Sequence, residues 1–156
     1  MDINCEWLEE HFFKHKLNDK QKRLVCKKFE TLLFKTDDTI IQQGQDCHAI
    51  YIICYGVATI HCQQNGETIH VATAKAGDLV GEMSFIAEEK ASATVSAKEP
   101  CLIYKLSRKA FIDTIQEDKG LVNLTFVTLL KRTADIVRKM NKEKASTQQY
   151  MSGSHC

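Results

Sequence analysis

The spacing of apolar side chains divides this chain into a helical start, a middle part with short strands and a helical end. Residues 6–15 mix aromatic and charged side chains, as a surface helix does. Asn18 followed by Gln21 has the pattern of a helix N-cap with its reciprocal partner. From Leu33 the apolar period changes from 3.6 toward 2, which indicates strands, and after Ser107 the helical period returns.

Short runs of β-branched and aromatic residues fill the middle of the chain. Glycines separate them, and Asn65-Gly66 is the strongest hairpin signal. Strands of this length and spacing are typical of a sandwich or jelly-roll barrel. We therefore predict an α+β fold, a β-barrel or jelly roll with N-terminal helices and a long C-terminal helix. The predicted strands lie at residues 40–41, 49–53, 57–60, 68–72, 93–97 and 102–106.

The last third of the chain predicts a short helix over 108–115 and a long one from about 120 to 144. Apolar residues in the long helix alternate spacings of four and three, which is the seam of a coiled coil. We expect a homodimer through this face, with the alternative that the helix packs only on its own barrel. The predicted dimer interface is Phe126, Leu129, Thr133, Ile136 and Met140.

Composition limits the class of protein. The chain of 156 residues predicts one domain over 1–145 and a polar, disordered tail over 146–156. A net charge of +1 gives no strong field toward nucleic acid or membrane. The start has no secretory signal, and no run reaches the roughly 20 apolar residues of a membrane span. Seven scattered cysteines without a CxxC pair indicate reduced thiols in a cytoplasmic protein.

One stretch carries most of the functional information: residues 77–94, with the sequence GDLVGEMSFIAEEKASAT. It predicts a strand end, a tight glycine turn, one turn of helix and a return strand. Such a turn points several backbone N–H groups at one spot, which suits an anion.

This stretch resembles the phosphate-binding cassette of the cyclic nucleotide-binding domain family, which includes the sensor domains of the cAMP receptor protein and of protein kinase A regulatory subunits. Two further motifs lie at matching intervals: Gly44, and the run YIICYG at residues 51–56. The resemblance covers roughly residues 12–140. It implies the jelly-roll fold with a long C-terminal helix, and cAMP or cGMP as the ligand, without a cofactor or catalytic residues.

The resemblance also implies roles for single residues. Glu82 would accept a hydrogen bond from the ribose 2′-OH, and the amides of residues 83–85 would face the cyclic phosphate. Gly81 lets the ligand approach the backbone, and Ser92 offers a hydroxyl for a phosphate oxygen or a purine edge. The predicted ligand-binding residues are Gly81, Glu82, Met83, Ser84, Phe85, Lys90, Ser92 and Ala93.

The family's phosphate-binding arginine corresponds to Ala91 in this chain. Loss of one partner from a buried charge pair costs about 2–5 kcal/mol, which is roughly 30- to several-thousand-fold in affinity. Lys90 is the nearby cation that could replace it, but neighbouring strand residues point to opposite faces. We predict a non-catalytic regulatory module for signalling, with weakened or altered phosphate recognition. The alternative is a degenerate domain without a ligand that serves in dimerisation or protein docking.

Two other functions compete with this one. Cys47-His48, His61-Cys62 and His70 suggest a metal-dependent barrel enzyme, but no HxH pair exists, and neighbouring side chains in a strand point to opposite faces. A metal site built by pairing across strands stays open as the weaker alternative. The basic residues of the last helix suggest nucleic-acid binding as a function. No helix-turn-helix follows that helix, so we expect no direct DNA binding.

Overall fold

The computed structural model describes the backbone of residues 2–153 and the side chains of residues 2–142. The chain forms two compact units, residues 1–122 and residues 123–156, which are described separately below. No helix in the described part is both long enough and apolar enough to span a bilayer.

The N-terminal helices differ in one respect from the sequence prediction. The helix expected over 6–15 is an α-helical turn, α1 (Cys5–Leu8), that continues directly as a π-helix, η1 (Glu9–Phe13). The next helix, α2 (Asp19–Lys28), begins with the predicted capping box: Asn18 accepts from the Gln21 N–H, and the Gln21 side chain accepts from the Asn18 N–H. This start is therefore confirmed.

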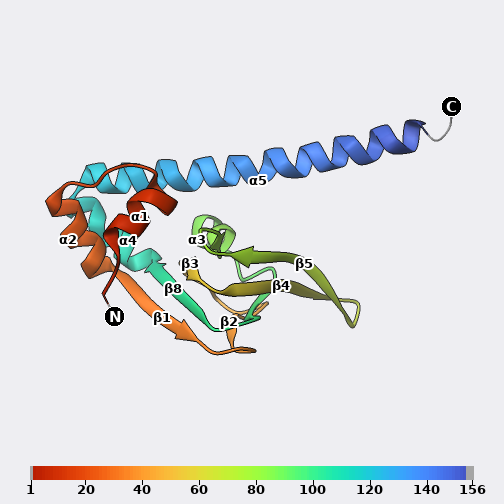
Figure 1. The fold of residues 1–156 in the computed structure, drawn as a ribbon, viewed down its shortest axis with the longest axis horizontal. Coiled ribbons are helices and arrows are strands. Elements are labelled where there is room, and N and C mark those ends of the chain that lie inside the picture. Colours follow the sequence, from red (N-terminus) through yellow and green to blue (C-terminus); the bar gives the residue numbers. More distant parts are fainter. Residues whose placement is uncertain (1, 154–156) are drawn as a thin grey trace. The chain divides into compact units, whose positions relative to one another are not determined.

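Two antiparallel four-stranded sheets form the barrel (Figure 1). The turn between β4 and β5 is the predicted hairpin, in which Asn65 and Gly66 both have positive φ, as a type I′ turn requires. The jelly-roll fold is therefore confirmed. The first sheet orders β1 (Phe29–Phe34), β8 (Cys101–Ser107), β3 (Ala49–Tyr55) and β6 (Leu79–Val80), and the second β2 (Thr39–Ile41), β7 (Thr94–Ala97), β4 (Val57–Gln64) and β5 (Glu67–Lys75).

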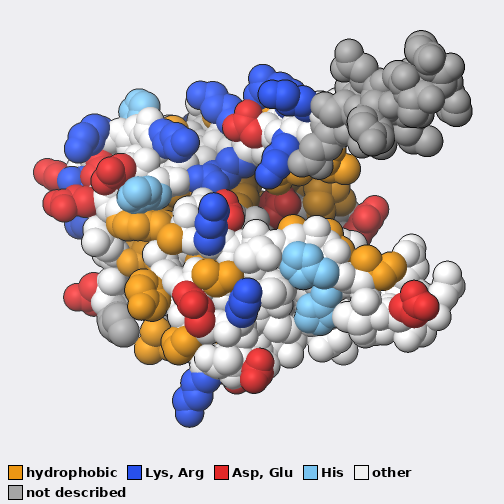
Figure 2. All heavy atoms as spheres, turned by 45° about the vertical axis from the view of Figure 1, so that its right-hand side comes forward, with side chains coloured by type: hydrophobic (Ala, Val, Ile, Leu, Met, Phe, Trp, Pro, Cys, Tyr) orange, Lys and Arg blue, Asp and Glu red, His pale blue; other side chains and the backbone are white. Residues whose placement is uncertain are grey.

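The hydrophobic core joins the inner faces of the two sheets. Ile53 and Ile103 come from the first sheet, and Ile41 and Val95 from the second; all four are buried. Burying a side chain of this size stabilises a fold by about 1.5–3 kcal/mol. The outer surface seen in Figure 2 mixes acidic and basic side chains and breaks its apolar groups into small clusters.

Two helices follow the barrel. Helix α4 (Arg108–Glu117) begins at Ser107, whose hydroxyl accepts from the Ala110 N–H, and α5 (Lys119–Gly153) is longer than the predicted 120–144. The tail that we expected to be disordered, 146–156, lies outside the residues whose side chains are described, so that expectation stays a prediction.

Candidate functional site

The stretch that the sequence singled out folds as predicted. Strand β6 ends at Val80, Gly81 turns the chain with a φ of +85°, and α3 (Glu82–Ala87) follows, before the chain returns as β7. A Cβ atom at Gly81 would lie 2.9 Å from the Ala49 carbonyl oxygen and 3.3 Å from Ile41 Cδ1. Glycine is required here both by the positive φ and by the close approach of two neighbouring strands.

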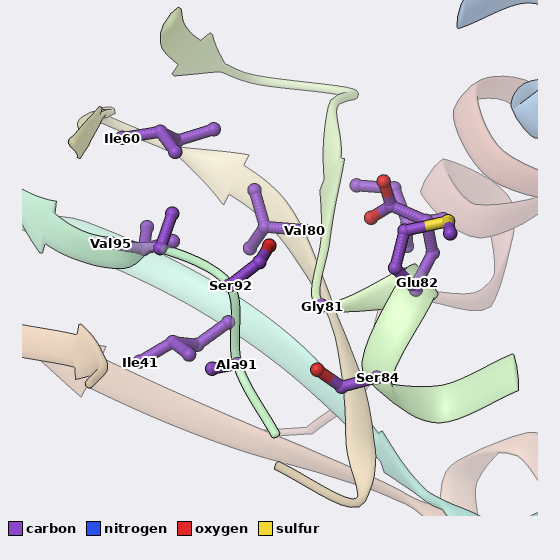
Figure 3. Close-up of a pocket in the computed structure, with 12 residues that line it drawn as sticks. Ile41, Ile60, Val80, Gly81, Glu82, Ser84, Ala91, Ser92 and Val95 are labelled. Atoms are coloured by element: carbon purple, nitrogen blue, oxygen red, sulfur yellow. The ribbon is translucent and has the colours of Figure 1, made fainter. Parts of the chain in front are cut away.

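A cavity of about 130 Å³ opens beside this turn (Figure 3). Three elements form it: the turn and start of α3, the segment before β7, and apolar side chains from the barrel strands. It is lined by Ile41, Ile60, Leu79, Val80, Gly81, Glu82, Met83, Ser84, Ala91, Ser92, Ala93 and Val95.

The cavity brings together most of the predicted ligand-binding residues, but not Phe85 or Lys90. The Phe85 ring is buried and packs edge-on against Phe111 at 5.5 Å between centroids, and its N–H donates to the Gly81 carbonyl at 3.1 Å. Lys90 is exposed to solvent. The structure therefore does not place these two residues on the cavity: Phe85 is buried in the core, and Lys90 lies exposed on a loop. The predicted ligand-binding residues that do line the cavity are Gly81, Glu82, Met83, Ser84, Ser92 and Ala93.

The backbone groups at the start of α3 are partly occupied. The Phe85 amide closes the first helical turn, and the Glu82 carboxylate accepts a hydrogen bond from its own backbone N–H. The amides of Met83 and Ser84 therefore remain as the donors that could meet a ligand. Because α3 has only six residues, its dipole adds little to them.

Glu82 is the one charged side chain among the residues that line the cavity; none of the lining residues is Lys, Arg or His. Burial raises the pKa of the Glu82 carboxyl, and the hydrogen bond from its own N–H acts in the opposite direction. A partly buried carboxylate without a cation beside it is well placed to accept a hydrogen bond from a neutral hydroxyl.

Ala91 lies on the opposite wall and is 6% exposed. Two backbone hydrogen bonds fix it: its N–H donates to the Gln45 carbonyl at 3.0 Å, and its own carbonyl accepts from the Gly44 N–H at 2.8 Å. Glu88 of the cassette pairs with Arg108 at 3.1 Å and lies outside the lining. The wall around Ala91 is therefore rigid and uncharged.

Several residues that shape the site had no predicted role in it. Thr94 is a strand residue, as predicted, and is the first residue of β7; its hydroxyl accepts from the Gln43 N–H at 3.0 Å, which fixes the loop before the cavity. The apolar wall of Ile41, Ile60 and Val95 comes from three different strands. No local motif marks these residues, because strand pairing alone brings them together.

The structure brings together two residues of the metal hypothesis. His61 and His70 are cross-strand partners on β4 and β5, whereas Cys47 is buried at the start of the barrel. No group of three or more His, Cys, Asp or Glu side chains within the described residues is arranged to hold a metal ion.

Comparison with known proteins agrees with this geometry. Residues 31–118 match the sequence profile of the cyclic nucleotide-binding domain, and the chain belongs to this family. The cAMP-dependent protein kinase regulatory subunit of Blastocladiella emersonii is 29% identical over 106 residues, which are 67% of this chain and 26% of that protein. The chain therefore spans about a quarter of this relative.

Two solved structures are similar in fold. A cyclic nucleotide-binding domain from Methylobacillus flagellatus, 22% identical, superposes with a TM-score of 0.82 over 91% of this chain and 83% of the other. The regulatory subunit of a cAMP-independent protein kinase A from Trypanosoma cruzi, solved with guanosine, has a TM-score of 0.67 and 25% identity, over 90% of this chain and 50% of the other.

Proposed function

We propose that this chain is a non-catalytic regulatory module that binds a nucleoside-type ligand in the cavity beside Gly81. Glu82 accepts from the ribose hydroxyl, and the apolar wall holds the base. A cyclic phosphate, where the ligand has one, meets only the amides of Met83 and Ser84 and the hydroxyl of Ser92. The phosphate therefore adds little to the affinity.

The proposal rests on the charge of the residues that line the cavity. Its lining contains a carboxylate and no cation, and Ala91 occupies the position that the family resemblance assigns to arginine. A phosphate in this place would lose its water without gaining an ion pair, which is costly. A neutral nucleoside pays no such cost and keeps the hydrogen bond to Glu82.

One similar protein supports a neutral ligand. The Trypanosoma cruzi regulatory subunit is described as cAMP-independent and was solved with guanosine, so this fold accommodates a nucleoside without a phosphate. We therefore propose a nucleoside as the ligand of this chain. Its affinity must be compared with those of cAMP and cGMP.

The proposal includes a homodimer through α5 in a cytoplasmic protein that does not itself contact DNA. Phe126, Ile136 and Met140 of the predicted seam are large apolar side chains that are 51%, 44% and 62% exposed, whereas Leu129 is buried. Seam residues at spacings of three and four fit a second copy of the same helix. The six described cysteines are all free, as in a reducing compartment.

The ligand is tested by calorimetry with adenosine, guanosine, cAMP and cGMP. We expect a nucleoside to bind, its cyclic nucleotide to bind no more tightly, and Glu82→Gln to weaken both. Ala91→Arg should strengthen the cyclic nucleotide by roughly 30-fold or more and leave the nucleoside unchanged. Lys90→Ala is the matched control and should change neither affinity.

Two results would contradict the proposal. Wild-type protein that binds a cyclic nucleotide far more tightly than the nucleoside would show that a phosphate contact is present. No binding by any of the four compounds would favour the ligand-free docking module. The dimer is tested by light scattering: Ile136→Glu should halve the mass, and Lys131→Glu, on another face of α5, should leave it unchanged.

A further inference from the structure

Two cysteines far apart in sequence meet at the N-terminal helices, away from the cavity. Cys5 is the first residue of α1, and Cys26 lies in the last turns of α2; their Sγ atoms are 3.4 Å apart. Both residues belong to the unit 1–122, and Figure 1 shows α1 beside α2. Among the six described cysteines, this is the pair whose sulfur atoms are in contact.

We propose that Cys5 and Cys26 form a reversible disulfide by exchange with a low-molecular-weight disulfide such as oxidised glutathione. The bond would join α1 to α2 and close a loop over residues 5–26. A sulfur–sulfur bond is about 2.0 Å long, so the two atoms must approach by about 1.4 Å.

The surroundings of the pair keep the two sulfur atoms close together. Helix α1 lies near the start of the chain and continues directly as η1. Tyr104 on β8 contacts this helix in two ways. Its hydroxyl accepts a hydrogen bond from the Asn4 N–H at 2.9 Å, and its ring packs edge-on against Trp7 with 6.0 Å between the ring centroids. Both contacts hold α1 against the barrel and leave its first residue facing α2.

The two thiols differ in exposure, which sets the order of the steps. Cys26 is exposed and Cys5 is half-buried. The Cys26 thiol loses its proton to water, and the thiolate attacks one sulfur of the glutathione disulfide. A mixed disulfide forms on Cys26, the glutathione sulfur–sulfur bond breaks, and one glutathione leaves as the thiolate and takes up a proton.

Cys5 then resolves the mixed disulfide. Its thiolate attacks the Cys26 sulfur, the bond to glutathione breaks, and a second glutathione leaves and is protonated. Two protein thiols are oxidised, and one glutathione disulfide is reduced to two thiols, so atoms and electrons balance. An excess of reduced glutathione reverses both steps, as expected for a redox-responsive pair in a reducing compartment.

The burial of Cys5 makes the second step the slow one. Burial, and then the neighbouring Cys26, raise the pKa of the Cys5 thiol to about 12; Glu9 acts in the same direction and Lys22 in the opposite one. Lys22 Nζ is 3.9 Å from Glu9 Oε1, so much of its charge is neutralised. Resolution should therefore become faster as the pH rises, because more Cys5 is then thiolate.

The experiment uses the full chain in glutathione buffers of increasing oxidised fraction. Free thiols are alkylated, the protein is digested without reductant, and the linked peptides are identified by mass spectrometry. We expect a Cys5–Cys26 peptide, a protein lighter by two hydrogen atoms, and a melting temperature higher by roughly 5–10 °C, because the closed loop restricts the unfolded chain. Reductant should reverse all three changes.

Two variants identify the mechanism, and a third is the control. Cys5→Ser should stop the reaction at a stable glutathione adduct on Cys26, and Cys26→Ser should abolish both adduct and linked peptide. Cys62→Ser, which removes a half-buried cysteine on β4, should react as wild type does. The proposal is overturned if Cys5 and Cys26 remain alkylated in the most oxidising buffer, or if linked peptides form at random among the cysteines.

Discussion

Replacing Gly81 by alanine tests whether the turn beside the cavity depends on close backbone approach as well as on its φ. An alanine at a φ of +85° costs about 1–2 kcal/mol through the backbone alone. The added Cβ would also lie 2.9 Å from the Ala49 carbonyl oxygen, and relieving such a contact in a packed region costs about 1–3 kcal/mol more. The free energy of unfolding should therefore fall by about 2–5 kcal/mol.

Gly44 provides the matched control. Its φ is +82°, nearly the same as that of Gly81, but a Cβ there would have no atom within 4 Å. Gly44→Ala should therefore lose only the conformational part, about 1–2 kcal/mol. Urea unfolding of both variants measures the difference directly. If Gly81→Ala and Gly44→Ala lose the same stability, the contact with Ala49 has no energetic weight, and the reasoning about this turn is refuted.

Three further changes have defined outcomes. Burial raises the pKa of Glu82 above 4.5, so the folded state binds this proton more tightly than the unfolded chain does. As the pH rises from 4.5 through the raised pKa, the wild type should lose stability relative to Glu82→Gln, which denaturant unfolding on both sides of that pKa would measure. Asn18→Ala should cost about 1 kcal/mol by removing the capping box of α2, whereas Asn18→Ser should restore most of it; equal losses would contradict the capping role. Thr94→Val should cost about 1–3 kcal/mol in urea unfolding because the Gln43 N–H loses its acceptor, and a neutral effect would show that water replaces it.

The sequence predicted those parts of the structure that local chemistry determines. The capping box at Asn18 and the hairpin at Asn65-Gly66 each depend on residues within four positions of one another. The positive φ at Gly81 is local in the same sense, whereas the close approach of Ala49 to Gly81 is not. The local features could be read without knowing the fold. The jelly roll followed from strand length and glycine spacing together with the family resemblance.

The remaining features depend on contacts between distant segments. Lys90 was predicted to lie on the pocket because it precedes Ala91, but it lies in the loop before β7 and its side chain is exposed. The π-helical turn η1 has no local signature comparable to a cap or a turn residue. The position of Cys5 against Cys26 follows from the packing of α1 on α2, which sequence spacing does not specify.

The structure separates the shape of the cassette from its charge. The shape comes from backbone features: the turn at Gly81 and the paired hydrogen bonds that join Ala91 to residues 44 and 45. In the family, the charge comes from the arginine that the resemblance assigns to position 91. In our proposal, alanine at this position therefore removes the charge and leaves the shape intact. A buried guanidinium would need a phosphate as its partner, and the empty pocket of such a protein carries the cost of an unpaired charge. An uncharged wall has no such cost, so the cavity stays stable without ligand. We therefore expect ligand binding in this cavity to vary little with ionic strength.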